Sequence, residues 1–392
     1  MVYRVGYHDS LTSGRALAIF SFGLIVPSPE ELLSDLRHAR LLLAILRRQW
    51  IEADELLAEG PISADVFVDL CMQGDVPGRV HAELSRAGRL DLIGPAAAER
   101  LQATRKRARL DNLLLIGRAE QALGLLLQAG VVPIALKGLD LLHRVYASFD
   151  ERSVVDVDLL IRPEQLRTAV GALEAAGWEA PPEPARSHYI RGSHHLPMRS
   201  PGPVAVEFEI HWNLAQDLRY SIDERELWRN AVPLEVGGHA VLRLHDHDFV
   251  AHLVLHHFTH YFNRQLKWAV DIHAVAGSEN FDWDIVVQRI RSWGATAACG
   301  MALVHLRKMF PEWIPAGAIA GLRVAGWRRL LLRPLSSSHP LDLFRNTQRR
   351  WIQLYIAAVL LEQPTRIIHW LAHRALRDRR PGSNPLDRTG SL

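Results

Sequence analysis

The sequence predicts an α+β fold, in which a small mixed β-sheet is flanked by helical regions before and after it. The sheet is indicated by apolar and polar residues that alternate over 154–161 and over 205–212, because successive side chains of a strand point to opposite faces. The flanks are indicated by apolar residues that recur at helical spacing. We therefore expect an N-terminal helical region (1–128), a core (129–248), a C-terminal helical region (249–380) and a disordered tail (381–392).

The N-terminal region is predicted to be helical because leucines recur at helical spacing between Leu32 and Trp50. A second long amphipathic helix is expected to lead into the core. Its apolar residues are Leu110, Leu113, Leu114, Ile116 and Leu123 to Leu127. Gly130 is expected to end this helix, because glycine accepts the left-handed conformation that follows many helix C-termini.

The core begins with an apolar strand over 131–136, followed by a Lys137-Gly138 turn into a helix. A second helix is expected to begin at Pro163 and to bury Leu166, Val170 and Leu173. The prolines between 181 and 184 predict a loop at the rim of a site.

Acidic residues share one face of each of two predicted strands. The period of 2 places Asp156 and Asp158 together on the first strand, and Glu207, Glu209 and His211 together on the second. Carboxylates grouped this closely repel one another, and a divalent cation is the usual reason to tolerate the repulsion. The alternative is a solvated face of an edge strand, but the apolar residues around Asp158 predict a buried strand, where unpaired carboxylates are costly. The third carboxylate is expected to be Glu209, with Glu207 as the alternative.

The basic residues and the histidine of the core each allow more than one interpretation. Lys137 and Gly138 can hold a phosphate, through the ammonium and through close backbone approach at a helix N-terminus, or can form a plain turn. Arg152 can reach a phosphate, brace the carboxylates, or form a salt bridge with Asp150 or Glu151. His211 can contact a nucleotide or acceptor, or hydrogen-bond a neighbouring carboxylate.

The chain resembles the uncharacterised bacterial nucleotidyltransferase family in four features that occur in the same order. They are the Leu-Lys137-Gly138 turn, Arg152, the Asp156-x-Asp158 strand and the Glu209-x-His211-Trp strand. That family lies within the DNA polymerase β-like nucleotidyltransferase superfamily, and the resemblance extends from about Trp50 to about Ala276. The chain departs from the superfamily at the turn, where Gly-Ser or Gly-Gly is common and Lys137-Gly138-Leu139 stands here.

The resemblance implies a nucleotidyltransferase that transfers a nucleoside monophosphate from an NTP, with ATP as the expected donor, and releases pyrophosphate. The acceptor would be a small molecule, peptide, protein or RNA. Mg²⁺, with Mn²⁺ as the alternative, would be bound by Asp156, Asp158 and Glu209, with Glu209 also as general base. Lys137, Gly138, Arg152 and His211 would bind the nucleotide or substrate.

Two other functions are compatible with the sequence. The first is a non-catalytic nucleotide-binding or interaction module, because no hydroxyl follows Gly138. The second is a metal-dependent phosphohydrolase, because His252, His256 and His260 share one helix face after the run His245-Asp-His-Asp248. Against the second function, Asp246 or Asp248 is well placed as a helix N-cap.

The remaining composition predicts a cytoplasmic protein with no membrane span. Cys71 and Cys299 are isolated in the sequence and form no metal-spaced pair, which excludes a disulfide framework and favours a reducing compartment. The apolar segments 16–26 and 356–361 fall short of the roughly 20 residues that a spanning helix needs. A net charge of +3 is too small to indicate a nucleic-acid partner.

Overall fold

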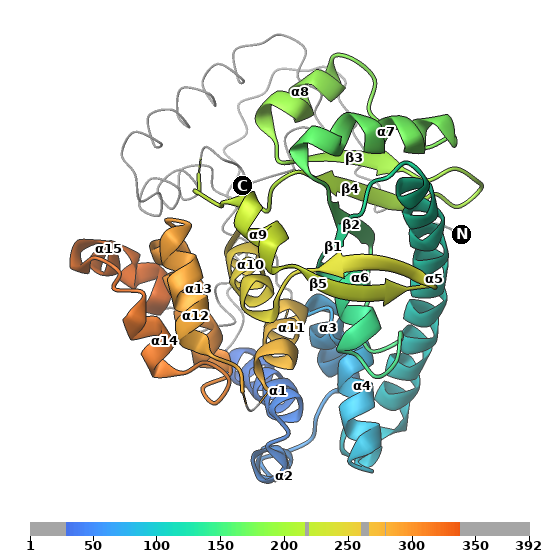
Figure 1. Cartoon of the computed structure of the whole chain (residues 1–392). Coiled ribbons are helices and arrows are strands. Elements are labelled where there is room, and N and C mark those ends of the chain that lie inside the picture. Colours follow the sequence, from blue (N-terminus) through green and yellow to red (C-terminus); the bar gives the residue numbers. More distant parts are fainter. Residues whose placement is uncertain (1–28, 216–218, 260–265, 279, 338–392) are drawn as a thin grey trace, which may run out of the picture.

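The computed structural model describes residues 29–215, 219–259, 266–278 and 280–337. Within these ranges a six-stranded mixed sheet lies between helices from both halves of the chain (Figure 1), which confirms the α+β class. The expected tail, the helical pattern beyond residue 337, the two apolar segments and His260 lie outside the described residues.

The sheet has the strand order β3-β4-β2-β1-β6-β5. Its strands are β1 Ile134–Ala135, β2 Asp156–Leu160, β3 His195–Arg199, β4 Glu207–His211, β5 Val232–Val236 and β6 His239–Arg243. The pairs β2–β4 and β1–β6 are parallel, while β1–β2, β3–β4 and β5–β6 are antiparallel. Strand β1 is shorter than the sequence predicts, but backbone hydrogen bonds from Leu242 to Pro133 and from Leu136 to Asp158 continue its pairing on either side.

Helices α1 to α5 precede the sheet. Their bounds are α1 Pro29–Arg47, α2 Trp50–Ala58, α3 Ala64–Gln73, α4 Pro77–Arg86 and α5 Gly94–Gln128. Figure 1 shows α5 running along one side of the molecule, from the other N-terminal helices to the sheet. Gly130 follows its C-terminus at a φ of +75°, as the sequence predicts.

The predicted buried face of α5 is wrong around residue 112. Leu110, Leu113 and Leu114 are exposed, whereas Asn112 is buried. The Asn112 amide donates to the carbonyl oxygens of Phe149 and Arg152. Its side-chain oxygen accepts from the backbone N–H of Val154 at 3.0 Å. The polar residue is inside because it satisfies the backbone of the segment that leads into β2.

In the described part of the chain, four α-helices accompany the sheet and six follow it. Those of the core are α6 Lys137–Arg144, α7 Leu166–Ala175, α8 Ala185–Gly192 and α9 Glu224–Asn230. Those of the C-terminal region are α10 Asp246–Thr259, α11 Lys267–Ala276, α12 Trp283–Ser292, α13 Thr296–Met309, α14 Ala316–Gly321 and α15 Gly326–Ser337. Within the described ranges, no helix is both long enough and apolar enough to cross a bilayer.

The two faces of the sheet pack against different sets of helices. Val157 and Phe208 belong to one apolar cluster with residues of α5 and α7. Leu160 belongs to the other cluster, which contains residues of α10 and α11. Because Asp158 is two residues from Leu160 on the same strand, it faces the side of α10 and α11.

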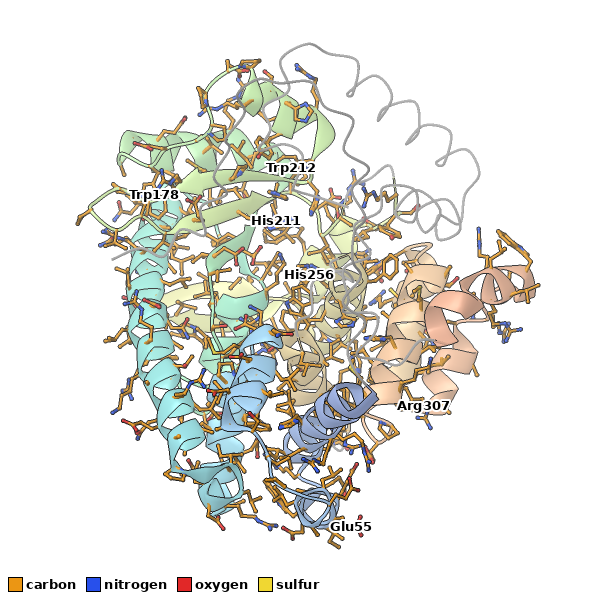
Figure 2. The ribbon with its side chains drawn as sticks, turned by 180° about the vertical axis from the view of Figure 1, so that it is seen from behind. Glu55, Trp178, His211, Trp212, His256 and Arg307 are labelled. Atoms are coloured by element: carbon orange, nitrogen blue, oxygen red, sulfur yellow. The ribbon has the colours of Figure 1, made fainter. Side chains whose placement is uncertain are left out.

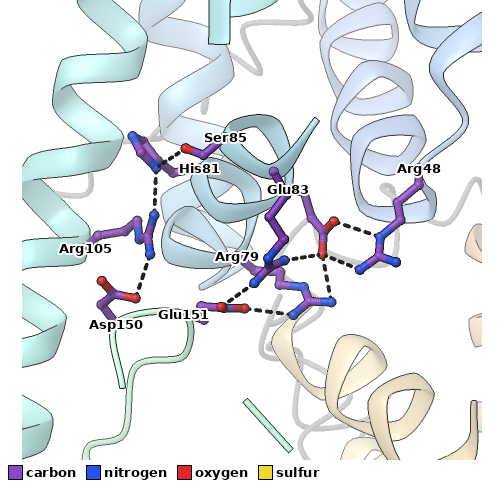
Figure 3. Close-up of polar contacts among 9 residues, drawn as sticks. Arg48, Arg79, His81, Glu83, Ser85, Arg105, Asp150 and Glu151 are labelled. Atoms are coloured by element: carbon purple, nitrogen blue, oxygen red, sulfur yellow. Dashed lines mark hydrogen bonds and ion pairs between the residues drawn. The ribbon is translucent and has the colours of Figure 1, made fainter. Parts of the chain in front are cut away.

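Ion pairs attach the N-terminal helices to the segment before β2 (Figure 3). Glu151 accepts from Arg79 at 2.9 Å and also from Arg86, both on α4. Asp150 accepts from Arg105 of α5 at 2.7 Å. These contacts, together with those of Asn112, fix the point at which the chain enters β2.

We expect Asn112→Ala to lower the free energy of unfolding by about 3 kcal/mol, because several buried backbone groups would lose their partner at roughly 1–3 kcal/mol each. Leu110→Ala, two residues away on the exposed side of α5, should change it by less than about 0.5 kcal/mol. Chemical denaturation of both variants measures the difference. Equal losses would show that α5 does not hold the segment through Asn112.

Candidate functional site

Asp158, Glu209 and His211 meet on one face of the sheet. Strands β2 and β4 are parallel neighbours, with Asp158 opposite Glu209 in register. The Nε2 atom of His211 lies 2.9 Å from Oδ1 of Asp158 and 3.1 Å from Oε2 of Glu209. One potential metal-ligand atom from each residue lies within 4.8 Å of the others. Figure 2 labels His211 at this position on the sheet.

Lys137 completes this group, which we call the acidic cluster: Lys137, Asp158, Glu209 and His211. Its Nζ donates to Oδ1 of Asp158 at 2.8 Å and lies 3.9 Å from Oε2 of Glu209. Lys137 is the first residue of α6 and has a φ of +42°, in the left-handed region that few non-glycine residues adopt. Such strained positions persist where the surroundings hold them and are frequent at functional sites.

Mutual pairing shifts the pKa values within the acidic cluster. Burial alone would raise the pKa of Asp158, but the Lys137 ammonium and the His211 hydrogen bond hold it well below its usual range. Against the same effect of burial, the hydrogen bond from His211 and the charge of Lys137 also lower the pKa of Glu209. Burial opposes the charged forms of Lys137 and His211, yet the carboxylates raise the pKa of both. The cluster is therefore a network of opposite charges at neutral pH.

Asp156 lies beside the acidic cluster rather than within it. It stands opposite Glu207 in the sheet, one pleat from Asp158, and it is not among the three residues whose ligand atoms converge. Burial, and next the charge of Asp158, raise its pKa to about 6. Its carboxyl group thus experiences the negative charge of the cluster.

Glu207 and Glu209, the two alternatives for a third carboxylate, lie in different surroundings. Glu207 is 55% exposed and pairs with Arg199 of β3 at 2.9 Å. Glu209 is 29% exposed and contacts both His211 and Lys137. The geometry brings only Glu209 to the cluster.

Gly138 is required by packing inside the protein. A Cβ atom added there would lie 2.6 Å from Cγ1 of Val154 and 3.0 Å from Nη1 of Arg152. The absence of a side chain therefore lets α6 close against the segment that leads into β2.

Arg152 is buried and pairs with Asp271 of α11. Its Nε and Nη2 atoms both donate to that carboxylate, with a distance of 2.9 Å from Nη2 to Oδ2. Tyr146 also donates to Asp271, at 2.6 Å. Of the alternatives for Arg152, the salt bridge with Asp150 or Glu151 does not form, because arginines of α4 and α5 pair with both of those acids.

Three histidines lie near the acidic cluster, and the sequence analysis selected only one of them, His252, as part of a separate metal site. His195 of β3 stands opposite His211 in register, and its Nε2 is 3.6 Å from Oε1 of Glu209. The rings of His194 and His211 are 5.5 Å apart. Burial, followed by the charges of Lys137 and His211, lowers the pKa of His252 on α10 to about 3. The adjacent His194-His195 pair before an alternating segment was the signal in the sequence.

The histidine run of α10 does not form a separate ligand set among the described residues. The rings of His252 and His256 are 6.1 Å apart, and neither residue belongs to a group of three converging ligands found in those ranges. Asp248 is buried and pairs with Arg289 of α12. Because the charge of the acidic cluster acts on His252, this helix forms part of the surroundings of that cluster.

The family described as "Uncharacterised nucleotidyltransferase" matches the chain over residues 60–311. This range contains the whole sheet, the acidic cluster, and α10 to α13. Neither the curated proteins nor the solved structures include a match to the chain.

We expect Lys137→Met to lower the free energy of unfolding by about 3–5 kcal/mol, because it leaves Asp158 buried without its charge partner. In an Asp158→Asn background the same change should cost less, with a coupling energy of about 1 kcal/mol or more. Arg199→Met, which breaks an exposed pair, should cost at most about 1 kcal/mol. Denaturant unfolding of the four variants gives the coupling directly, and additive losses would contradict the pairing.

Proposed function

Because the chain belongs to the uncharacterised nucleotidyltransferase family, we propose that it transfers a nucleoside monophosphate from an NTP to an acceptor at the acidic cluster, with release of pyrophosphate. Membership supports nucleotidyl transfer as the general reaction and an NTP as the donor. The site, the metal and the wider DNA polymerase β-like ancestry are parts of the proposal.

The observation that carries the proposal is the meeting of Asp158, Glu209 and Lys137 on one sheet face. A triphosphate is strongly anionic, so a site for it needs cations that bridge and neutralise its oxygens. Two carboxylates can hold such a cation, and a lysine ammonium can pair with a phosphate directly. In the acidic cluster, the two carboxylates and the lysine ammonium lie within a few ångströms of one another.

The donor atoms of the acidic cluster fit a divalent metal. The carboxylate oxygens of Asp158 and Glu209 are the hard ligands that Mg²⁺ prefers, and the nearby His211 nitrogen is compatible with Mn²⁺. Asp156, on the same sheet face, is proposed to bind metal together with Asp158 and Glu209. A bound ion would neutralise charge on the triphosphate as pyrophosphate leaves.

The protein's own groups divide the remaining tasks. Lys137 holds the triphosphate as a point charge at the start of α6. Glu209 accepts the proton of the acceptor hydroxyl, because it is the cluster carboxylate that solvent reaches, at 29% exposure against 2% for Asp158. His211 orients both carboxylates through its Nε2.

Gly138 and Arg152 enter the proposal as positioning residues. Gly138 allows α6 to approach β2, and Arg152 connects the same segment to α11 through Asp271. Neither residue is proposed to contact the phosphates. The Arg152 guanidinium is paired with Asp271, and Gly138 packs closely against Val154.

A specific observation favours one alternative, a non-catalytic nucleotide-binding module. The Lys137 ammonium already compensates Asp158, so the cluster can be charge-balanced without a metal. Such a module would bind an NTP and release no pyrophosphate. The cytoplasm remains the proposed location, because ATP is the expected donor and the buried Cys71 and Cys299 form no disulfide in the described part of the chain.

Asp158→Asn is expected to lower Mg²⁺-dependent release of pyrophosphate from NTPs by roughly 100-fold or more, the effect of removing one electrostatic contact near reacting atoms. The substitution removes charge with little change of volume. Glu207→Gln is the matched control, since it changes an exposed carboxylate of the same sheet and should retain most activity.

Release of pyrophosphate from each of the four NTPs should be measured with and without Mg²⁺, together with NTP binding. Retained activity in Asp158→Asn would contradict the assignment of the site. Tight NTP binding by the unsubstituted protein without any pyrophosphate release, in the presence of candidate acceptors, would support the binding module instead.

A further inference from the structure

We propose that His194, His195 and His211 form a site for a divalent transition-metal ion, best suited to Zn²⁺, next to the acidic cluster. We call these three residues the histidine triad. One ring nitrogen from each residue lies within 4.8 Å of those of the other two. The site is additional to the proposed Mg²⁺ site and does not depend on the proposed reaction.

The spacing of the three rings fits tetrahedral coordination. The ring centroids are 4.9 Å apart for His194–His195, 5.1 Å for His195–His211 and 5.5 Å for His194–His211. Three imidazoles bound tetrahedrally to one ion, at Zn–N distances near 2.0–2.1 Å, would place their centroids roughly 5 Å apart. Only small side-chain movements would therefore bring the nitrogens to bonding distance.

The fold explains how two consecutive histidines reach the same place. In a regular strand His194 and His195 would point to opposite faces, but β3 begins only at His195 and the chain bends at His194. The backbone N–H of Trp212 donates to the His194 carbonyl oxygen at 3.0 Å, which fixes the bend beside β4. His195 stands directly opposite His211 in the antiparallel pair.

Each ring of the histidine triad has a buried nitrogen that no described group satisfies. The Nδ1 atoms of all three residues are buried without a hydrogen-bond partner among the described residues. A buried polar atom left unpaired costs roughly 1–3 kcal/mol. Each ring therefore keeps a nitrogen that no described group occupies, and an ion bound there would offset that cost.

His211 has the arrangement of a metal ligand held by a carboxylate. Its Nε2 contacts Asp158 and Glu209, which leaves Nδ1 as the nitrogen available to an ion. Metal-binding histidines commonly use one nitrogen for the metal and donate from the other to a carboxylate, which orients the ring. Asp158 would thus orient His211 without binding this ion.

The nitrogen ligands select against Mg²⁺ at this site. Imidazole suits zinc and neighbouring transition metals, whereas Mg²⁺ prefers oxygen ligands and six-fold coordination. Three histidines with an open fourth position form the ligand set of known zinc sites.

The test is Zn²⁺ binding by the chelator-treated full chain, followed by competition with a coloured chelator and by the visible spectrum of the Co²⁺ form. We expect one Zn²⁺ per chain with high affinity and a tetrahedral Co²⁺ spectrum. His195→Ala should abolish both, and Asp158→Asn should weaken binding by about 10–100-fold as the loss of an orienting carboxylate does.

Three controls separate this proposal from other results. His188→Ala and His247→Ala alter histidines outside the triad and should leave the affinity unchanged. Glu209→Gln should keep Zn²⁺ bound and weaken it no more than Asp158→Asn does, because both carboxylates contact the same Nε2 atom of His211. Loss of Zn²⁺ in Glu209→Gln would place the ion in the acidic cluster and overturn the triad. Absence of Zn²⁺ binding in the unsubstituted protein, or equal affinity in His195→Ala, would overturn it as well.

Discussion

A carboxylate buried in a β-sheet is costly unless opposite charge and hydrogen bonds compensate it, and Asp158 is 2% exposed. Its compensation comes from Lys137 and His211, whose Nζ and Nε2 atoms lie 2.8 Å and 2.9 Å from the same oxygen, Oδ1. The first depends on the turn into α6 and the second on the register between β2 and β4. Much of the surrounding architecture can be understood as holding these two partners in place.

The supports of the site come from distant parts of the chain. Asn112 of α5 binds the backbone on both sides of residue 152, and Asp271 of α11 binds the Arg152 side chain. Gly138 packs where the same segment meets α6. Helices from before and after the sheet therefore act on the position of β2, although none of them supplies a carboxylate to the acidic cluster. A shift of any support would alter the distance between Lys137 and Asp158.

Alternation along strands was sufficient to predict the acidic face, because a period of 2 depends only on local geometry. It placed Asp158 and Glu209 on matching faces, and the register then brought them together. Sequence could not predict the partner of Arg152, since Asp271 is far away in the chain and nearer acids were available. It also misjudged Leu110 and Asn112, because a hydrogen-bonded asparagine can be buried while a leucine stays exposed. The histidine triad was missed because it depends on a bend and on an antiparallel register that residue spacing does not encode.

The proposed reaction requires that a divalent ion bind between Asp158 and Glu209 and bridge them to a triphosphate. Crystals grown with Mn²⁺ and a non-hydrolysable NTP analogue would test it most directly, through anomalous diffraction from the manganese. We expect an anomalous peak bonded to carboxylate oxygens of both residues, with the analogue's phosphates within reach of Lys137. A fully bound analogue with no manganese at these carboxylates, or with its phosphates on another face of the sheet, would show that the acidic cluster is not the site of nucleotidyl transfer.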